Sequence, residues 1–163
     1  MKFIALTQGK VAVVDDCDYE YLKQWKWTHS QGYAIRKSPR RGGKQTTILM
    51  HRLVARRAGL RITGVNVDHY KDGGLDNRRG NLRIANQSQN CANQRLNRNN
   101  TSGYKGVSWY PKTKRWKVQI GVNRRVIHLG FRVDIKEAAR LYDKAAKKYF
   151  GKFARTNAME GLL

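Results

Sequence analysis

Asp68 and His69 are the adjacent residues in this sequence best suited to chemistry. An imidazole titrates near neutral pH and is a natural general base for activating water. A carboxylate is a hard oxygen ligand that suits Mg²⁺, and the carboxamide oxygen of Asn90 is a second acceptable ligand. The pair ends a β-type run and precedes a Gly- and Asn-rich loop over residues 72–81. Asn81, at the exit of this loop, is placed to pin the loop backbone.

The elements that would position these residues follow directly along the chain. The loop leads into a short strand pattern over residues 82–85 and then into a polar helix that begins at Asn86. We expect this helix to return Asn90 towards the Asp68–His69 pair. The alternative is that His69 only ends a strand and that the Asn residues serve as caps and turn formers. The residue pattern alone leaves both interpretations open.

Basic residues dominate the composition of the chain. Its 163 residues include 34 Lys and Arg but only 11 Asp and Glu, a formal net charge of +23. Such a charge destabilises a fold by self-repulsion unless a polyanion neutralises it. The basic residues are interleaved with Trp, Tyr and β-branched residues, which suits folded surfaces that contact phosphates and stack on sugars or bases. This favours nucleic acid as the partner over a membrane surface, a disordered basic tail or a mere solubility effect.

Length and cysteine content narrow the class of protein. The length fits one or two small domains. Cys17 and Cys91 are the only cysteines, which argues against a disulfide scaffold and a Cys-ligated structural zinc. The first apolar run is too short for a signal peptide, and no later run is long enough for a membrane span. We therefore expect a soluble, cytoplasmic protein without membrane association.

The first half of the chain is predicted to be rich in β structure. Trp25 and Trp27 are expected in its core. The basic turn with Arg40, Arg41 and Lys44 either clamps a phosphate or forms a solvated turn. The expected elements are a hairpin over residues 3–7 and 10–14, a helix over 19–25 capped by Asp18, strands over 27–37 and 45–50, and a helix over 51–58 ended by Gly59.

The second half is predicted to form a small sheet on one helix. Strand patterns over residues 104–110, 115–121 and 125–130 predict an antiparallel meander, and a helix opened by Asp134 and ended by Gly151 follows. A sheet of this width can enter the major groove of DNA, where Arg reads guanine edges. The residues expected on the face away from the helix are Lys105, Trp109, Arg115, Lys117, Gln119 and Arg125.

Two ordered sets of motifs resemble known families. Residues 50–94, with Met-His-Arg-Leu-Val, Val-Asp-His, Leu-Asp-Asn-Arg-Arg-Gly-Asn-Leu-Arg and Gln-Ser-Gln-Asn, resemble an HNH homing endonuclease. Residues 101–157, with Ser-Gly-Tyr-Lys-Gly-Val, Ile-His-Leu-Gly, Glu-Ala-Ala-Arg-Leu-Tyr-Asp and Phe-Ala-Arg-Thr-Asn, resemble an AP2 DNA-binding domain. The chain as a whole resembles the HNH–AP2 endonucleases common in phages.

The resemblance implies an α+β protein with two domains. The implied organisation is a nuclease domain over residues 1–92, β-rich over 1–50 and with a ββα-metal core over about 63–95, a linker over 93–103 and an AP2 domain over 104–157.

The resemblance also implies a role for each site residue. His69 matches the general base, Asn81 the residue that fixes the loop, and Asp68 and Asn90 the ligands of one Mg²⁺ or Mn²⁺. The implied activity is metal-dependent hydrolysis of double-stranded DNA, with nicking by a monomer as the simpler expectation. The expected DNA-binding residues are Arg40, Arg41, Lys44, Arg78, Lys105, Trp109, Arg115, Lys117 and Arg125.

Several positions depart from the family patterns. Asn90 stands where many relatives have His, which weakens the expectation of tight transition-metal binding. Gly80 replaces a frequent Glu, and Ser108 and His128 replace frequent Arg or Trp residues on the AP2 face, so sequence preference should differ from that of other AP2 domains. Two competing interpretations are a DNA-binding regulator with a decayed nuclease domain and an RNA-binding protein.

Overall fold

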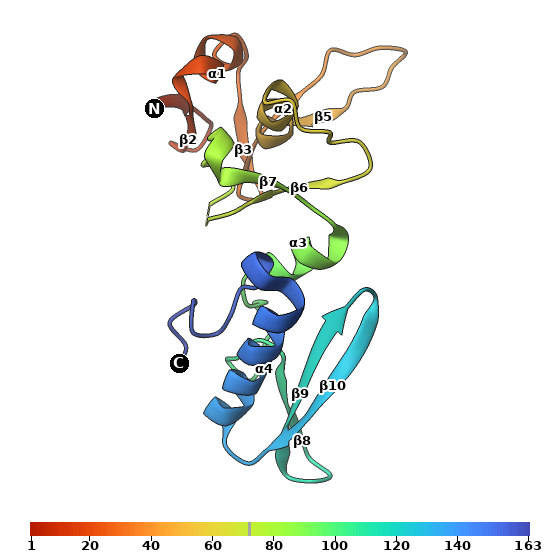
Figure 1. Cartoon of the computed structure of the whole chain (residues 1–163). Helices are drawn as coiled ribbons and strands as arrows, with labels where there is room; N and C mark the ends of the chain where they lie inside the picture. The colour runs from red at the N-terminus through yellow and green to blue at the C-terminus, as the bar shows by residue number, and fades with distance from the viewer. Residues whose placement is uncertain (72) are drawn as a thin grey trace. The chain divides into compact units, whose positions relative to one another are not determined.

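The computed structural model describes residues 1–71 and 73–163. The described chain is a mixture of short helices and small antiparallel sheets, which confirms the predicted α+β class (Figure 1). It divides into two compact units, Met1–Ala85 and Asn86–Leu163, and each is described here by itself. The change of unit therefore falls before the polar stretch of residues 93–103, which belongs to the second unit.

The first unit contains small antiparallel sheets around a helix-covered core. β1 pairs with β2, β4 lies between β3 and β5, and β6 pairs with β7. The strands are β1 (Lys2–Ala5), β2 (Val11–Val14), β3 (Thr28–Ser30), β4 (Tyr33–Lys37), β5 (Thr47–Leu49), β6 (Asn66–His69) and β7 (Leu82–Ala85).

Turn residues decide where these strands begin and end. The predicted first hairpin is confirmed, and its turn contains Gln8 and Gly9 with φ of 63° and 64°. The single strand predicted over residues 27–37 is wrong, because Gln31 and Gly32, with φ of 50° and 84°, fold it into the β3–β4 hairpin. Glycine adopts such backbone angles at little cost, so the turn overrides the β-type pattern on either side.

Two helices complete the first unit, α1 (Asp16–Leu22) and α2 (Met50–Arg57). The prediction that Asp18 caps α1 is wrong, since the N-cap position is Asp15 and Asp18 is fully buried inside the helix. Arg57 and Arg79 both bind the Asp18 carboxylate, at 2.9 and 2.7 Å. A buried carboxylate needs such partners. Asp18 therefore ties α1 to α2 and to the segment that precedes β7.

The core of the first unit forms where α2 packs against the strands. Leu22, Met50 and Val54 are fully buried there, and Trp27 is 3% exposed, as predicted, whereas Trp25 is only partly buried at its edge. The helix predicted over residues 51–58 is confirmed within one residue at each end. Gly59, with φ of 81°, follows it and ends the helical geometry.

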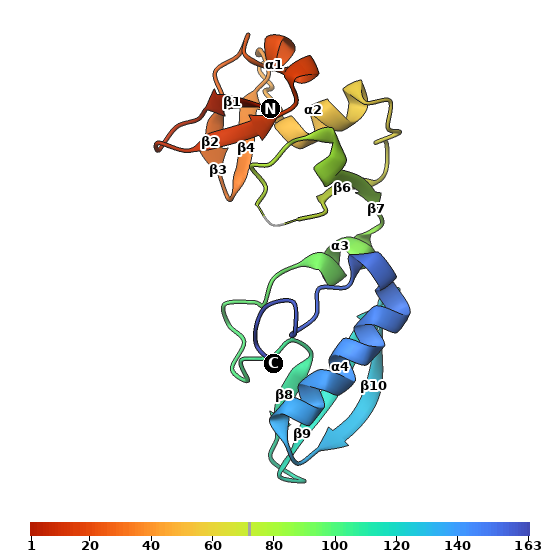
Figure 2. The same cartoon turned by 60° about the vertical axis from the view of Figure 1, so that its left-hand side comes forward.

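The second unit is a three-stranded sheet packed on one long helix (Figure 2). The predicted meander is confirmed, with β9 between β8 and β10. The side chain of Asp134 accepts a hydrogen bond from the Glu137 backbone and caps α4, which ends at Gly151 as predicted. The elements are α3 (Gln87–Asn93), β8 (Val107–Tyr110), β9 (Arg115–Val122), β10 (Arg125–Arg132), α4 (Ile135–Phe150) and η2 (Gly151–Phe153).

Candidate active site and nucleic-acid interface

His69 ends β6 and lies among aromatic rings. The centroid of its ring is 4.9 Å from that of His51 on α2 and 6.0 Å from that of Tyr33 on β4. Only 8% of His69 is exposed. On the neighbouring strand its register partner is Leu82. The imidazole is thus held between α2, β4 and the β6–β7 hairpin.

The surroundings keep the His69 ring neutral near pH 7. Burial lowers its pKa below the ordinary 6.5, while a hydrogen bond with Asn77 and the charges of Asp68 and Asp76 act in the opposite direction. The neutral form is the one that accepts a proton, so the environment favours a base over an acid.

His51 and Tyr33 are the residues beside His69 that the sequence interpretation did not assign. Burial, followed by the charges of His69 and Arg52, lowers the pKa of His51 to about 3. Its Nδ1 atom is buried and has no hydrogen-bond partner within the described part of the chain. In the sequence, His51 could have been identified by its position on the face of α2 that also carries the buried Val54 and Ala55.

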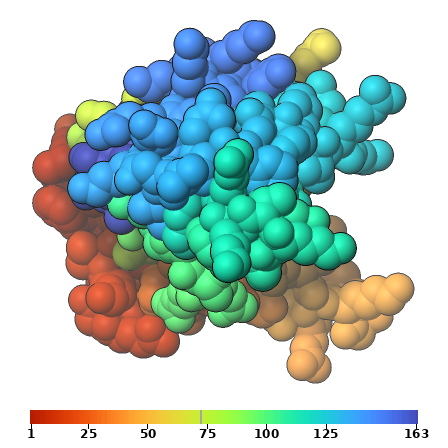
Figure 3. Space-filling model, turned by 90° about the horizontal axis from the view of Figure 1, so that it is seen from below, coloured from red at the N-terminus to blue at the C-terminus, as the bar shows by residue number. Residues whose placement is uncertain are grey.

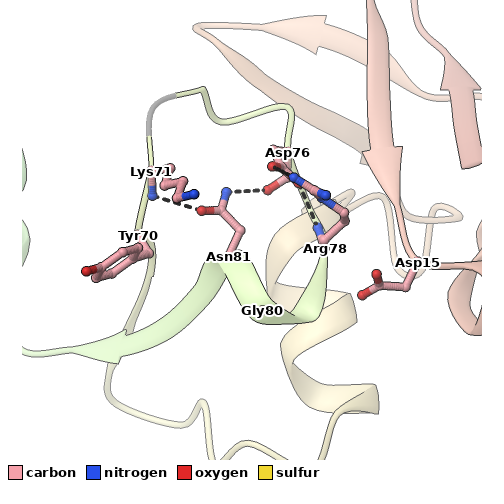
Figure 4. A pocket seen from close by; sticks show the side chains of 7 residues that line it. All are labelled: Asp15, Tyr70, Lys71, Asp76, Arg78, Gly80 and Asn81. Carbon is pink, nitrogen blue, oxygen red and sulfur yellow. Dashed lines mark hydrogen bonds and ion pairs between the residues drawn. The ribbon is translucent and has the colours of Figure 1, made fainter. Parts of the chain in front are cut away.

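Asn81 joins the two ends of the loop that follows His69 (Figure 4). Its side-chain oxygen accepts a hydrogen bond from the Lys71 backbone at 2.8 Å, and its side-chain nitrogen donates to the Asp76 carbonyl at 2.8 Å. Its own carbonyl accepts from the Tyr70 backbone at 2.7 Å. The residue lies at the end of the short 3₁₀ helix η1 (Arg79–Asn81).

The first hairpin supports the same loop from the other side. Val13 on β2 exchanges backbone hydrogen bonds with Leu75 and Asn77, each at 2.8 Å. The loop after His69 is therefore held by three sets of hydrogen bonds. They are made by Val13, by Asn81, and by the Arg79 backbone with the Asp15 carboxylate. A hollow of about 280 Å³ lies beside it, lined by Asp15, Tyr70, Lys71, Asp76, Arg78, Gly80 and Asn81.

Arg78, one of the predicted DNA-binding residues, lines this hollow with its charge already paired. Its guanidinium grips the Asp76 carboxylate through two hydrogen bonds of 2.9 and 2.7 Å. These hydrogen bonds from Arg78 lower the pKa of Asp76. The geometry gives Arg78 a local structural partner, and its contact with DNA stays a prediction.

Asp68 forms a cross-strand ion pair with Arg83. The two residues are register partners on β6 and β7, and both Nε and Nη2 of Arg83 lie within 2.9 Å of the carboxylate oxygen Oδ2. The Tyr70 ring lies 4.8 Å from the same guanidinium. Asp68 and His69 are adjacent at the end of β6, and the Asp68 charge acts to raise the pKa of the His69 imidazole.

The oxygen atoms that Asp68 and Asn90 offer to a metal suit Mg²⁺ better than zinc. Mg²⁺ keeps several waters and takes only one or two protein carboxylates, so one Asp and one amide oxygen form an acceptable set. Within residues 1–71 and 73–163, no group of three or more His, Cys, Asp or Glu is arranged to hold a metal. Asn90 lies on α3, in the second unit, where the side chain of Asn86 caps the helix by accepting from the Gln89 backbone.

The strand register of the second unit corrects the predicted binding face. Val118 and Ile120 of β9 are buried against α4, so Arg115, Lys117 and Gln119 point to the other side as predicted. The placement of Trp109 and Arg125 on that side is wrong. Trp109 pairs with Trp116 and Arg125 with Val122, so both share the helix-facing side.

The face away from α4 carries more aromatic rings than the sequence predicted. The Phe131 ring centroid is 5.5 Å from that of Tyr110 and 4.8 Å from that of His128. A bulge at Leu129 shifts the register and brings Phe131 opposite Lys117. In the space-filling view of Figure 3, side chains of the β8–β10 segment (green to light blue) project from this unit.

The placement of Lys105 on the open face is also wrong. Its ammonium group donates to the carbonyls of Ala92, Gln94 and Arg155 at 2.7, 2.6 and 3.3 Å. Burial, followed by the charge of Arg155, lowers its pKa to about 8. Lys105 thus joins α3 to the segment after α4, and its contact with DNA stays a prediction.

The basic turn between β4 and β5 is exposed, as a contact surface requires. Arg41 and Lys44 exchange backbone hydrogen bonds of 3.0 and 3.1 Å, and Gly42 and Gly43 between them have φ of 55° and 74°. Arg40, Arg41 and Lys44 all project into solvent. Their contact with DNA stays a prediction.

Comparison with known proteins gives one distant similarity. No family model and no solved structure matches the chain. The chain is 28% identical over 92 residues to Protein 3.8 of Escherichia phage T7, covering 56% of this chain and 75% of that protein. None of the helices in the described ranges is long and apolar enough to cross a membrane.

Proposed function

We propose that this protein is a metal-dependent HNH-type DNA endonuclease that nicks double-stranded DNA, with an AP2-type module that places it on the substrate. The observation that carries the proposal is the neutral, buried His69 at the mouth of a loop whose ends Asn81 ties together. A base fixed in position and kept unprotonated is what hydrolysis of a phosphodiester by water needs. The similarity to a phage protein supports a phage-encoded enzyme acting in the host cytoplasm.

In the proposed reaction, His69 takes a proton from a water that attacks the scissile phosphorus. The bond from phosphorus to the 3′ oxygen breaks, and the leaving oxygen takes a proton from solvent water, which leaves a 5′-phosphate and a 3′-hydroxyl. Asp68 and Asn90 are the residues that would hold Mg²⁺, which when bound stabilises negative charge on the phosphate and leaving oxygen. Asn81 keeps the loop fixed, and Arg115 and Lys117 contact the DNA from the open face of the second unit.

A plasmid-nicking assay tests this proposal. Supercoiled DNA should become relaxed in Mg²⁺ and stay supercoiled in EDTA. His69→Ala should bind DNA like the parent and nick about 10²–10⁴-fold more slowly, the range expected for loss of a general base. Parent protein that binds DNA but leaves plasmid supercoiled in both Mg²⁺ and Mn²⁺ would refute the enzyme assignment.

One observation favours a second candidate, a DNA-binding regulator without nuclease activity. Arg83 already neutralises Asp68 through two hydrogen bonds, as expected where a carboxylate has a structural role. Arg83→Gln separates the two candidates. The enzyme should show altered Mg²⁺ dependence of nicking because a metal ligand has lost its partner, whereas a regulator should show no nicking in either form.

A further inference from the structure

A basic groove lies between α2 and the β4–β5 hairpin, and its lining residues differ from Tyr33, His51 and His69 of the site described above. The helix packs against both strands, and Figure 1 shows it beside β5. The groove encloses about 340 Å³, and among the residues that the structure describes its lining includes three arginines but no carboxylate. The lining residues are Arg36, Thr47, Ile48, Leu49, Arg52, Leu53, Arg56 and Ile62.

The absence of acidic residues extends well beyond the groove. Between Glu20 and Asp68 the sequence contains no Asp or Glu, although it contains 11 Lys and Arg. Most arginines on a folded surface find carboxylates nearby, as Arg57 and Arg78 do. No residue of this stretch offers that partner, and none of the described residues that line the groove is acidic, so its positive charge is available to an external anion.

Arg36 is the central residue of the groove. It pairs with Ile48 and lies on the core-facing side of β4, where an arginine is uncommon. Its guanidinium carbon is 4.2 Å from the Trp25 ring centroid and 5.7 Å from that of Trp27. Its Nε atom is buried without a hydrogen-bond partner in the residues that the structure describes.

This arrangement prepares Arg36 to bind an oxyanion. A buried N–H group without a partner is destabilising, and a bound acceptor would remove that cost. Stacking on Trp25 fixes the plane of the guanidinium in advance, so less freedom is lost when its N–H groups fork onto two oxygens. Phosphate presents oxygens in the geometry that such a fork binds.

The two arginines of α2 complete the site. Arg52 donates to the carbonyls of Val65 at 3.0 Å and Ile62 at 2.7 Å, so it holds the wall of the groove and contributes its charge. Arg56 follows one helical turn later on the same face and is exposed. It is therefore free to move onto an anion that Arg36 has bound.

We propose that this groove binds one backbone phosphate of double-stranded DNA, at a contact separate from both the cleavage centre and the sheet of the second unit. The turn with Arg40, Arg41 and Lys44 extends the positive surface from the same hairpin. Several basic groups carried by one hairpin favour a polyanion over a single small anion. The choice of DNA as the ligand rests on the proposed function, but this phosphate contact contributes to binding alone.

Binding of a labelled duplex in EDTA, measured by fluorescence anisotropy over a range of salt concentrations, tests the site without cleavage. Arg36→Gln and Arg56→Gln should each weaken binding about 10-fold and reduce the slope of log K against log salt by about one, the value for one lost phosphate contact. The double variant should lose about the same slope as either single variant, because both arginines serve one phosphate. Arg36→Lys keeps the charge but not the fork, and should fall between parent and Arg36→Gln.

Lys26→Gln is the matched control, since it removes one exposed charge from the same acid-free stretch outside the groove. An equal loss of slope in Lys26→Gln, or an additive loss in the double variant, would refute a shared phosphate site. Tighter binding of duplex RNA than of DNA, with the same response to the variants, would overturn DNA as the ligand. Near-ultraviolet circular dichroism checks that each variant is folded. If Arg36→Gln unfolds, Arg56→Gln tests the site instead, because Arg56 is exposed. Because no step requires nicking, a failed nuclease assay leaves this result interpretable.

Discussion

The buried His51 makes a quantitative prediction about acid stability. Its pKa is about 3 in the folded protein and 6.5 for the exposed side chain. Between these values the unfolded chain binds a proton that the folded chain does not. The contribution of His51 to stability is therefore fully present above pH 6.5 and is lost as the pH falls from 6.5 towards 3.

The magnitude follows from the size of the shift. One pKa unit corresponds to about 1.4 kcal/mol, so lowering the pH from 7 to 5 should cost about 2 kcal/mol through His51 alone. The lowered pKa of His69 acts in the same direction. Over the whole window the loss from His51 approaches about 5 kcal/mol, which is comparable with the total stability of a small domain.

Urea unfolding at pH 7 and pH 5 measures this loss. Replacing Trp109 and Trp116 by Phe leaves Trp25 and Trp27 as reporters of the first unit alone. His51→Phe keeps an aromatic ring against His69 but cannot titrate. Between pH 7 and pH 5, the free energy of unfolding of His51→Phe should fall by about 2 kcal/mol less than that of the parent. An equal fall in both proteins would show that His51 is not buried in its neutral form.

Three further predictions concern the carboxylate, glycine and imidazole positions. Asp18→Asn should lower the free energy of unfolding of the first unit by about 2–4 kcal/mol, because two guanidinium groups lose their shared carboxylate. Chemical denaturation measures this loss, and a change smaller than the experimental error would contradict the prediction. Gly106→Ala should destabilise the second unit by about 2–5 kcal/mol, since φ is 74° and the new Cβ would lie 2.0 Å from the Tyr142 ring. Gly121→Ala, with nothing within 4 Å of its Cβ, is the control in the same thermal melts. The nicking rate should rise with pH through an inflection below 6.5 and then stay level, because His69 must be neutral; an inflection above 7 would exclude this base.

Periodicity and turn chemistry were sufficient to predict most elements. Alternating strands in the second unit and the helical spacing after Asp134 describe local geometry, which depends on nearby residues alone. The hairpin at Gln31 and Gly32 was missed because the pattern on either side continues the β signal. Loop pinning by Asn81 follows the same local logic, since its hydrogen-bond partners lie within ten residues of it.

Register and long-range contacts placed the remaining site residues. Trp109 and Arg125 are residue types typical of a binding face, but the pairing of β8, β9 and β10 puts them on the other side of the sheet, where both remain exposed. In the sequence Lys105 resembles any exposed lysine. In the structure its ammonium group donates to three carbonyls, one of which belongs to Arg155, the partner most distant in the sequence. Neither fact can be derived from spacing, because each depends on which strands meet.

By itself the sequence determined the α+β class, the excess of positive charge and the identity of the residues able to do chemistry. Only the tertiary structure decided which side chains have partners: Asp68 with Arg83, Arg78 with Asp76, His69 with His51 and Tyr33, and Arg36 with two tryptophans. The physical reason is that the protonation state and availability of a side chain depend on burial and on neighbouring charge. Both come from elements that are distant in the sequence and meet only in the folded chain.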